Sequence, residues 1–158
     1  MAGLHVDAVE AAYRRVHGRL WRALLAYCGD PDVASDAEAE AFVQAIARGD
    51  GIDDVERWVW RASFRIAAGL LTVERTVSVV PDRGDGRVPF SVVEFVSELS
   101  MLSPQQRACV VLRHVGGYSS AEIAEILDTS TGTVSVQLNR AHNALAASGS
   151  ADVAREAQ

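Results

Sequence analysis

Residues 119–140 constrain the fold of this chain most, because they have the pattern of two short helices joined by a tight turn. Ser119 and Glu122 stand at the spacing of a capping box, which marks the start of a helix. Residues 128–130 then interrupt the helical pattern, since their small polar side chains compete for backbone hydrogen bonds. The second helix repeats its apolar side chains at helical spacing, at Val134, Leu138, Ala141 and Leu145.

This pattern is typical of a DNA-binding helix-turn-helix, whose second helix enters the major groove. An ordinary helical hairpin within a hydrophobic core has a similar pattern and is the alternative. The small polar residues around the turn suit helix capping and entry into a groove better than packing. They therefore favour the DNA-binding interpretation.

The outward side of the second helix carries the candidate DNA contacts. Asparagine and arginine side chains can discriminate adenine and guanine, and a valine can meet the methyl group of thymine. Arg140 either reads a base or holds a phosphate, while hydroxyls at the helix N-terminus suit a phosphate contact. Ser135 either contacts DNA or is only solvated. The candidates are Thr131, Thr133, Ser135, Val136, Asn139 and Arg140.

The rest of the chain also has helical periodicity, so we predict an all-α fold. Between Thr76 and Pro89 this periodicity is lost and turn-forming residues accumulate. The sequence therefore predicts two small helical domains, over 5–75 and 91–147, joined by a flexible linker over 76–90. The polar segment 148–158 is expected to be a disordered tail. Helices are expected over about 7–28, 32–48, 53–70, 91–99 and 103–115, before the helix-turn-helix.

Composition and charge argue against several classes of protein. All fifteen basic residues are arginines, and the formal net charge is −6, with −3 on each of the segments 1–75 and 91–158. Strong autonomous DNA binding is not favoured, because phosphate contacts supply much of the affinity for DNA. No apolar run approaches about 18 residues and no signal-like start exists, which predicts a cytoplasmic protein without membrane insertion. The cysteines and histidines are scattered, so no metal, cofactor or catalytic site is predicted.

The expected third helix combines aromatic side chains with arginines, the two groups that hold exposed bases. The arginines at 57, 61 and 65 step by four residues and so form one stripe, which we expect to be largely exposed. Stacking a base on an aromatic side chain contributes roughly 1–3 kcal/mol. The aromatic residues either pack in the core or stack on bases, and the pattern leaves both roles open. The DNA-binding candidates here are Trp58, Trp60, Arg61, Phe64 and Arg65.

Several of these segments together resemble one known family. Segments 102–113, 117–127, 132–134 and 139–141 are similar to the promoter-reading C-terminal domain of bacterial RNA polymerase sigma factors of the extracytoplasmic-function (ECF) type, in the sigma-70 family. Segment 58–67 resembles the family's helix that melts and reads the −10 element. Gly29-Asp30-Pro31, with Asp36 and Phe42, resembles its helix that grips the polymerase clamp.

The resemblance implies a function and partners. It implies an alternative sigma factor that reads −10 and −35 promoter elements, helps melt DNA and joins the nucleoid as part of the holoenzyme. The implied partners are core RNA polymerase, promoter DNA and an anti-sigma factor, with no cofactor. The resemblance also implies that polymerase is bound by the helix that carries Asp36, Glu40 and Phe42. It implies further that the loop 49–55 holds one flipped base.

Three departures from the family pattern define the alternatives. Ala39 stands where a glutamine is usual, and 70–75 keeps one arginine of a basic run. In the second helix of the helix-turn-helix, positions that are often basic in the family are here Ser135, Gln137 and His142. Each loss of a basic side chain removes an expected contact with a DNA phosphate. A degenerate sigma-like protein, or a helix-turn-helix regulator that binds a protein or DNA without supporting initiation, is therefore the alternative. An enzyme is a third and disfavoured class.

If residues 76–90 form a linker, trypsin should cleave the native chain first after Arg83 or Arg87, because exposed irregular segments are cut before helices. Mass spectrometry of a limited digestion measures the order of cleavage. Protection of both sites to the same degree as the helices, in the absence of a bound partner, would contradict the two-domain prediction.

Overall fold

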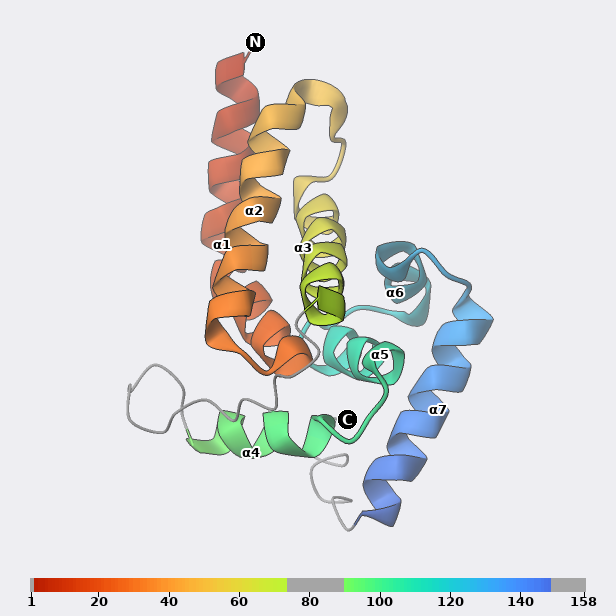
Figure 1. The fold of residues 1–158 in the computed structure, drawn as a ribbon. Helices are drawn as coiled ribbons and strands as arrows, with labels where there is room; N and C mark the ends of the chain where they lie inside the picture. Colours follow the sequence, from red (N-terminus) through yellow and green to blue (C-terminus); the bar gives the residue numbers. More distant parts are fainter. Residues whose placement is uncertain (1, 74–89, 149–158) are drawn as a thin grey trace.

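The computed structural model describes residues 2–73 and 90–148, which are helical apart from short turns (Figure 1). The all-α class predicted from the sequence is confirmed. The predicted linker up to residue 89, and the predicted tail from residue 149, lie outside the described residues. The elements are α1 (Ala2–Cys28), α2 (Pro31–Arg48), the short 3₁₀ helix η1 (Gly49–Gly51), α3 (Val55–Val73), α4 (Phe90–Leu99), α5 (Pro104–His114), α6 (Ser120–Leu127) and α7 (Thr131–Ala147).

Helices α1, α2 and α3 lie side by side in the first half of the chain (Figure 1). The turn between α1 and α2 is set by Asp30, whose side chain accepts a hydrogen bond from the backbone nitrogen of Asp32 at 2.8 Å. Pro31 occupies the first position of α2, where its missing N–H has no partner to lose. The helical spacing of the apolar residues in α2 predicts an inner face that includes Ile46, but this side chain is 49% exposed, so the prediction is wrong at this position.

Helix α1 begins before the predicted start at Asp7, because its first turns are docked on α2. His5 is buried, and its Nε2 donates a hydrogen bond to the backbone oxygen of Ala45 at 2.7 Å. Val9 is also buried, one turn further along the same side of the helix. The capping-box spacing of Asp7 and Glu10 therefore falls inside a helix rather than at its end.

Each helix of the second half from α5 onward begins at a serine cap. Ser103 with Gln106, and Ser119 with Glu122, form complete capping boxes, and Ser130 accepts a hydrogen bond from the backbone nitrogen of Thr133. These caps satisfy backbone donors that the first turn of a helix leaves unpaired. The helix-turn-helix predicted at 119–140 is thus confirmed as local structure.

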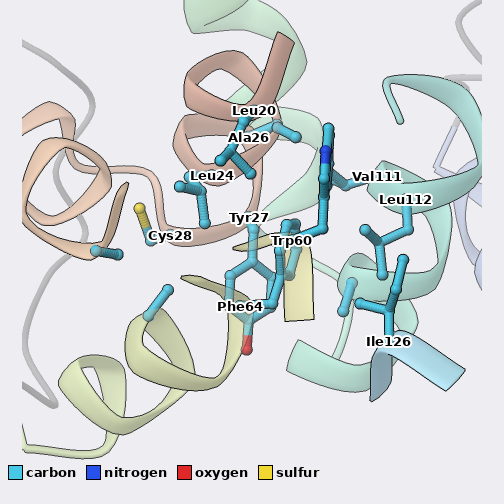
Figure 2. Close-up of a cluster of buried hydrophobic side chains, with 14 of the residues drawn as sticks. Leu20, Leu24, Ala26, Tyr27, Cys28, Trp60, Phe64, Val111, Leu112 and Ile126 are labelled. Atoms are coloured by element: carbon cyan, nitrogen blue, oxygen red, sulfur yellow. The ribbon is translucent and has the colours of Figure 1, made fainter. Parts of the chain in front are cut away.

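The two halves share one hydrophobic core (Figure 2). Helix α1 contacts α4 and α5, and α3 contacts α6. Between them, the ring of Trp60 lies edge-on to Tyr118 at 5.2 Å between centroids, and the guanidinium of Arg107 lies 5.5 Å from the centroid of Tyr27. Side chains of both halves fill the centre of this core: Leu20, Leu24, Trp60, Phe64, Val111, Leu112 and Ile126.

Candidate DNA and polymerase interfaces

The turn of the helix-turn-helix is built from residues whose side chains and backbone suit it. Asp128 adopts a left-handed conformation, with φ of 55°, directly after α6. This conformation is uncommon outside glycine, and aspartate is one of the residues that tolerate it. The turn ends at Ser130, whose hydroxyl caps α7 and lies 2.9 Å from the hydroxyl of Thr133. The start of α7 is therefore fixed by local contacts.

The buried and exposed sides of helix α7 agree with the spacing of its apolar residues. Val134, Leu138, Ala141 and Leu145 are buried, so the predicted inner face is confirmed. On the opposite side Val136 is 46% exposed, and Thr133 is half-buried because it faces the cap. The candidates Thr131, Ser135, Val136, Asn139 and Arg140 are all exposed.

Two neighbours of this face have contacts that the sequence did not reveal. The side-chain nitrogen of Gln137 donates to the side-chain oxygen of Gln105 at 3.1 Å, which ties α7 to α5. Arg113 of α5 donates to the hydroxyl of Ser120, at the start of α6. Arg113 was missed as a candidate because its position near α7 depends on how α5 packs, which no local pattern encodes.

Arg113 lies in a polar groove beside α7 that suits a phosphate. The groove has a volume of about 480 Å³. On its wall the Nε2 atoms of His114 and His142 are 3.4 Å apart. An arginine among polar groups can hold a phosphate without reading sequence. The groove is lined by Arg113, His114, Ser120, Ser135, Leu138, Asn139 and His142.

The aromatic candidates on α3 differ in exposure. Trp60 is completely buried and Phe64 is 3% exposed, and both lie in the shared core (Figure 2). Trp58 is half-buried and lines a groove between the two halves. The sequence left packing and base stacking open for these residues, and in this arrangement Trp60 and Phe64 pack. A DNA contact by either remains a prediction that requires α6 to move away.

The arginine stripe of α3 meets acidic residues of the second half. Arg57 donates to carboxylate oxygens of Glu122 and Glu125, both at 2.8 Å. Arg61 and Arg65 are exposed as expected, although a guanidinium nitrogen of Arg61 lies 3.9 Å from a carboxylate oxygen of Asp128. Arg57 is half-buried, so the expectation of an exposed stripe was wrong at this position.

These ion pairs also shift the pKa values of Arg57 and Glu122. Partial burial alone would lower the pKa of Arg57, but the carboxylates of Glu125 and Glu122 raise it. The pKa of Glu122 is lowered, first by its hydrogen bond from the backbone of Ser119 and further by Arg57. Both side chains therefore stay charged at neutral pH.

Helix α2 carries the residues predicted to contact polymerase. Asp36 and Glu40 are exposed one turn apart, and Glu40 accepts a hydrogen bond from Gln44 at 3.0 Å. Phe42 is 7% exposed and lies edge-on to Tyr13 of α1. Its side chain therefore packs on the buried side of α2 and is not part of the exposed surface of this helix. Val43, 59% exposed beside Glu40, is an apolar surface residue that the sequence analysis did not single out.

Other features of the described residues bear on chemistry. Burial raises the pKa of both Cys28 and Cys109 to about 11, so neither thiol forms a ready nucleophile at neutral pH. Within 2–73 and 90–148, no three histidine, cysteine or acidic side chains form a group that could hold a metal ion. None of the helices in these ranges is both long and apolar enough to span a membrane.

Comparison with known proteins finds a similar family model and similar relatives for the second half of the chain. The family model described as "Sigma-70, region 4" matches residues 93–145, which contain α5 and the helix-turn-helix. The second half of the chain is therefore similar to region 4 of sigma-70 factors. The ECF RNA polymerase sigma factor SigG of Mycobacterium tuberculosis, from two strains, is 47% identical to this chain over 51 residues. This match covers 32% of the chain but only 14% of SigG.

A solved structure extends the likeness to both halves. The sigma factor RpoE of Bartonella quintana, in its complex with the anti-sigma factor NepR, superposes with a TM-score of 0.74 at 20% sequence identity. The match covers 86% of this chain and 92% of the RpoE chain, so it extends over both halves of the fold. These findings agree with the resemblance to ECF sigma factors predicted from the sequence: the sequence likeness covers the second half, and the likeness in fold covers both halves.

The serine cap of α7 should be worth a measurable part of the stability. Replacement of Ser130 by Ala removes the hydrogen bond to the Thr133 nitrogen, and we expect a loss of about 0.5–2 kcal/mol in the free energy of unfolding. Ser135→Ala, on the exposed side of the same helix, is the matched control and should change stability by less than about 0.5 kcal/mol. Denaturant unfolding measures both, and equal effects would show that the cap is unimportant.

Proposed function

We propose that this protein is an alternative sigma factor that binds core RNA polymerase and directs transcription initiation at specific promoters. One observation carries the proposal: the segment that matches sigma-70 region 4 contains a fully capped helix-turn-helix with an exposed polar face on α7. Thr131, Ser135, Val136, Asn139 and Arg140 on this face, with Thr133 at its edge, would read the −35 element.

The first half of the chain supplies the other proposed roles. Asp36, Glu40 and Val43 give α2 an exposed surface of mixed acidic and apolar character, which suits a basic surface of core polymerase. Arg61, Arg65 and the aromatic residues of α3 would hold the separated −10 strand once the duplex opens. Each of these roles is binding rather than covalent catalysis.

An anti-sigma factor is the proposed regulatory partner. The support is the likeness to RpoE, which is a sigma factor captured with its anti-sigma factor. The second candidate function is a sigma-like protein or helix-turn-helix regulator that does not support initiation. The burial of Trp60 and Phe64, together with the net charge of −6, is the observation that favours it.

Run-off transcription with purified core polymerase and a library of promoter fragments tests the proposal. We expect transcripts from particular promoters only. The double variant D36R/E40R should reduce run-off by about tenfold, since it reverses two charges on the proposed polymerase surface. The matched control D7R/E10R makes the same charge change on exposed positions of α1 and should keep the activity.

Each outcome of that assay distinguishes a class of protein. Polymerase binding without transcripts would support the degenerate sigma-like protein. DNA binding without any polymerase binding would support a conventional regulator. Equal loss in both double variants would contradict the assignment of the α2 surface.

Arg140→Ala tests the proposed −35 contact. If Arg140 reads a base, the variant should weaken promoter binding by holoenzyme by about 1–3 kcal/mol and relax the preference at one position. If it holds a phosphate, the loss should be uniform over all promoter variants. Binding of labelled duplexes with single −35 substitutions measures both, with Arg14→Ala, exposed on α1, as the control. No loss with any duplex would exclude Arg140 from the interface.

A further inference from the structure

Two histidines that are far apart in the sequence meet in the folded chain. His114 is the last residue of α5, and His142 lies in α7, 28 residues further along. Their Nε2 atoms are 3.4 Å apart, while the ring centroids are 5.6 Å apart, so the two Nε2 atoms point towards each other. Both side chains are half-buried in the lining of the groove beside α7.

This separation is the one that two ligands of a single tetrahedral metal ion require. A bond from Zn²⁺ to a histidine nitrogen is about 2.0–2.1 Å long, so a tetrahedral angle places two such nitrogens about 3.3–3.4 Å apart. Histidine binds a metal as the neutral imidazole, so each ring must carry its proton on Nδ1 and leave Nε2 unprotonated. Imidazole nitrogen favours transition metals such as Zn²⁺, whereas Mg²⁺ prefers oxygen ligands.

The helices that carry the two rings are held together independently of any metal. Leu112 of α5 and both Leu138 and Ala141 of α7 are buried in the hydrophobic core. Nearer the start of both helices, the side-chain nitrogen of Gln137 donates to the side-chain oxygen of Gln105 at 3.1 Å. The backbone beneath both histidines is therefore fixed, and a metal ion would meet two ligands that are already in position.

The groove that contains the pair lies beside the exposed polar face of α7. Ser135 and Asn139 of that face belong to its lining, and so does Arg113 of α5. No carboxylate stands among the described residues that line it. In sigma factors of this type the position of His142 is often basic, so this chain has lost a permanent positive charge there. A bound divalent cation would supply positive charge at the same place.

We propose that His114 and His142 bind one divalent transition-metal ion of the Zn²⁺ class and that this ion adds positive charge to the groove beside α7. Within 2–73 and 90–148, no third histidine, cysteine or acidic side chain completes a ligand group. Water molecules therefore fill the remaining positions, and a phosphate oxygen of DNA can replace one of them. The metal site itself assumes no function, whereas its effect on DNA binding rests on the proposed function.

Arg113 makes the binding of the metal and of DNA interdependent. Its guanidinium and a divalent cation in the same groove repel each other, and a phosphate between them replaces this repulsion by two attractions. The ion should therefore raise the affinity for DNA, and DNA should raise the affinity for the ion by the same factor.

Isothermal titration of the untagged, full-length protein with ZnCl₂ tests the metal site. We expect one Zn²⁺ per chain, and MgCl₂ should give no binding heat. H114A and H142A should each weaken Zn²⁺ binding by more than about tenfold, because each removes one of the two protein ligands. The matched control H17Q removes an imidazole from α1, keeps a hydrogen-bond donor for Glu38, and should bind Zn²⁺ like the wild type.

Three results of the titration would overturn the proposal. They are the absence of Zn²⁺ binding by the wild type, unchanged binding by both H114A and H142A, and a loss in H17Q as large as the loss in H142A. Circular dichroism verifies that each variant is folded. H142R keeps the test decisive if H142A does not fold, since it also removes the ligand and should also lose the ion.

Fluorescence anisotropy of a labelled duplex of mixed sequence tests the effect on DNA, because a phosphate contact does not depend on sequence. Zn²⁺ should tighten binding of the duplex by the wild type by about fivefold or more and leave H142A unchanged. H142R should bind more tightly than H142A both with and without Zn²⁺, because a permanent charge takes the place of the ion. Equal tightening of the wild type and H142A would refute the effect on DNA.

Run-off transcription by the wild type separates this inference from the proposed function. A chain that directs transcription but binds no Zn²⁺ refutes the metal site alone. A chain that binds Zn²⁺ through His114 and His142 but directs no transcription refutes the proposed sigma activity alone.

Discussion

The packing of Trp60 between the two halves is the interaction on which the rest of this structure depends. Its ring contacts Phe64 on its own helix and Tyr118 from the second half, and the guanidinium of Arg19 lies 5.7 Å from its centroid. A buried tryptophan contributes several kcal/mol to stability, and its removal from a core typically costs about 3–5 kcal/mol. The ring lies on α3 and contacts side chains of both halves. The relative placement of the halves and the stability of the protein are therefore coupled.

If α3 binds DNA as proposed, this coupling gives the helix two uses that exclude each other. The residue types that bind exposed bases, aromatic rings with neighbouring arginines, are also the types that pack and pair well inside a protein. Here they pack, and the acidic side of α6 neutralises Arg57. The polar outer face of α7 remains exposed in the same arrangement. In the proposed function, polymerase therefore has to supply the energy that separates the halves as well as the binding surface for the holoenzyme.

Local structure could be predicted from the sequence, and contacts between the halves could not. The serine caps, the turn at 128–130 and the inner face of α7 follow from residues within a few positions of one another. The pairing of Arg57 with Glu122 joins positions 65 apart, and no periodicity reports which face of a helix a distant segment will cover. Phe42 shows the same limit, because family likeness marked α2 as a binding helix but not which of its side chains face outward.

The most direct test of this account is the distance distribution between spin labels at A8C on α1 and N143C on α7, measured by pulsed electron resonance. Both positions are exposed, and the buried thiols of Cys28 and Cys109, with pKa values of about 11, should react slowly with the labelling reagent. The account predicts one narrow distribution in the free protein and a different, shifted distribution after core polymerase is added. A broad distribution in the free protein, or one that polymerase leaves unchanged, would contradict it.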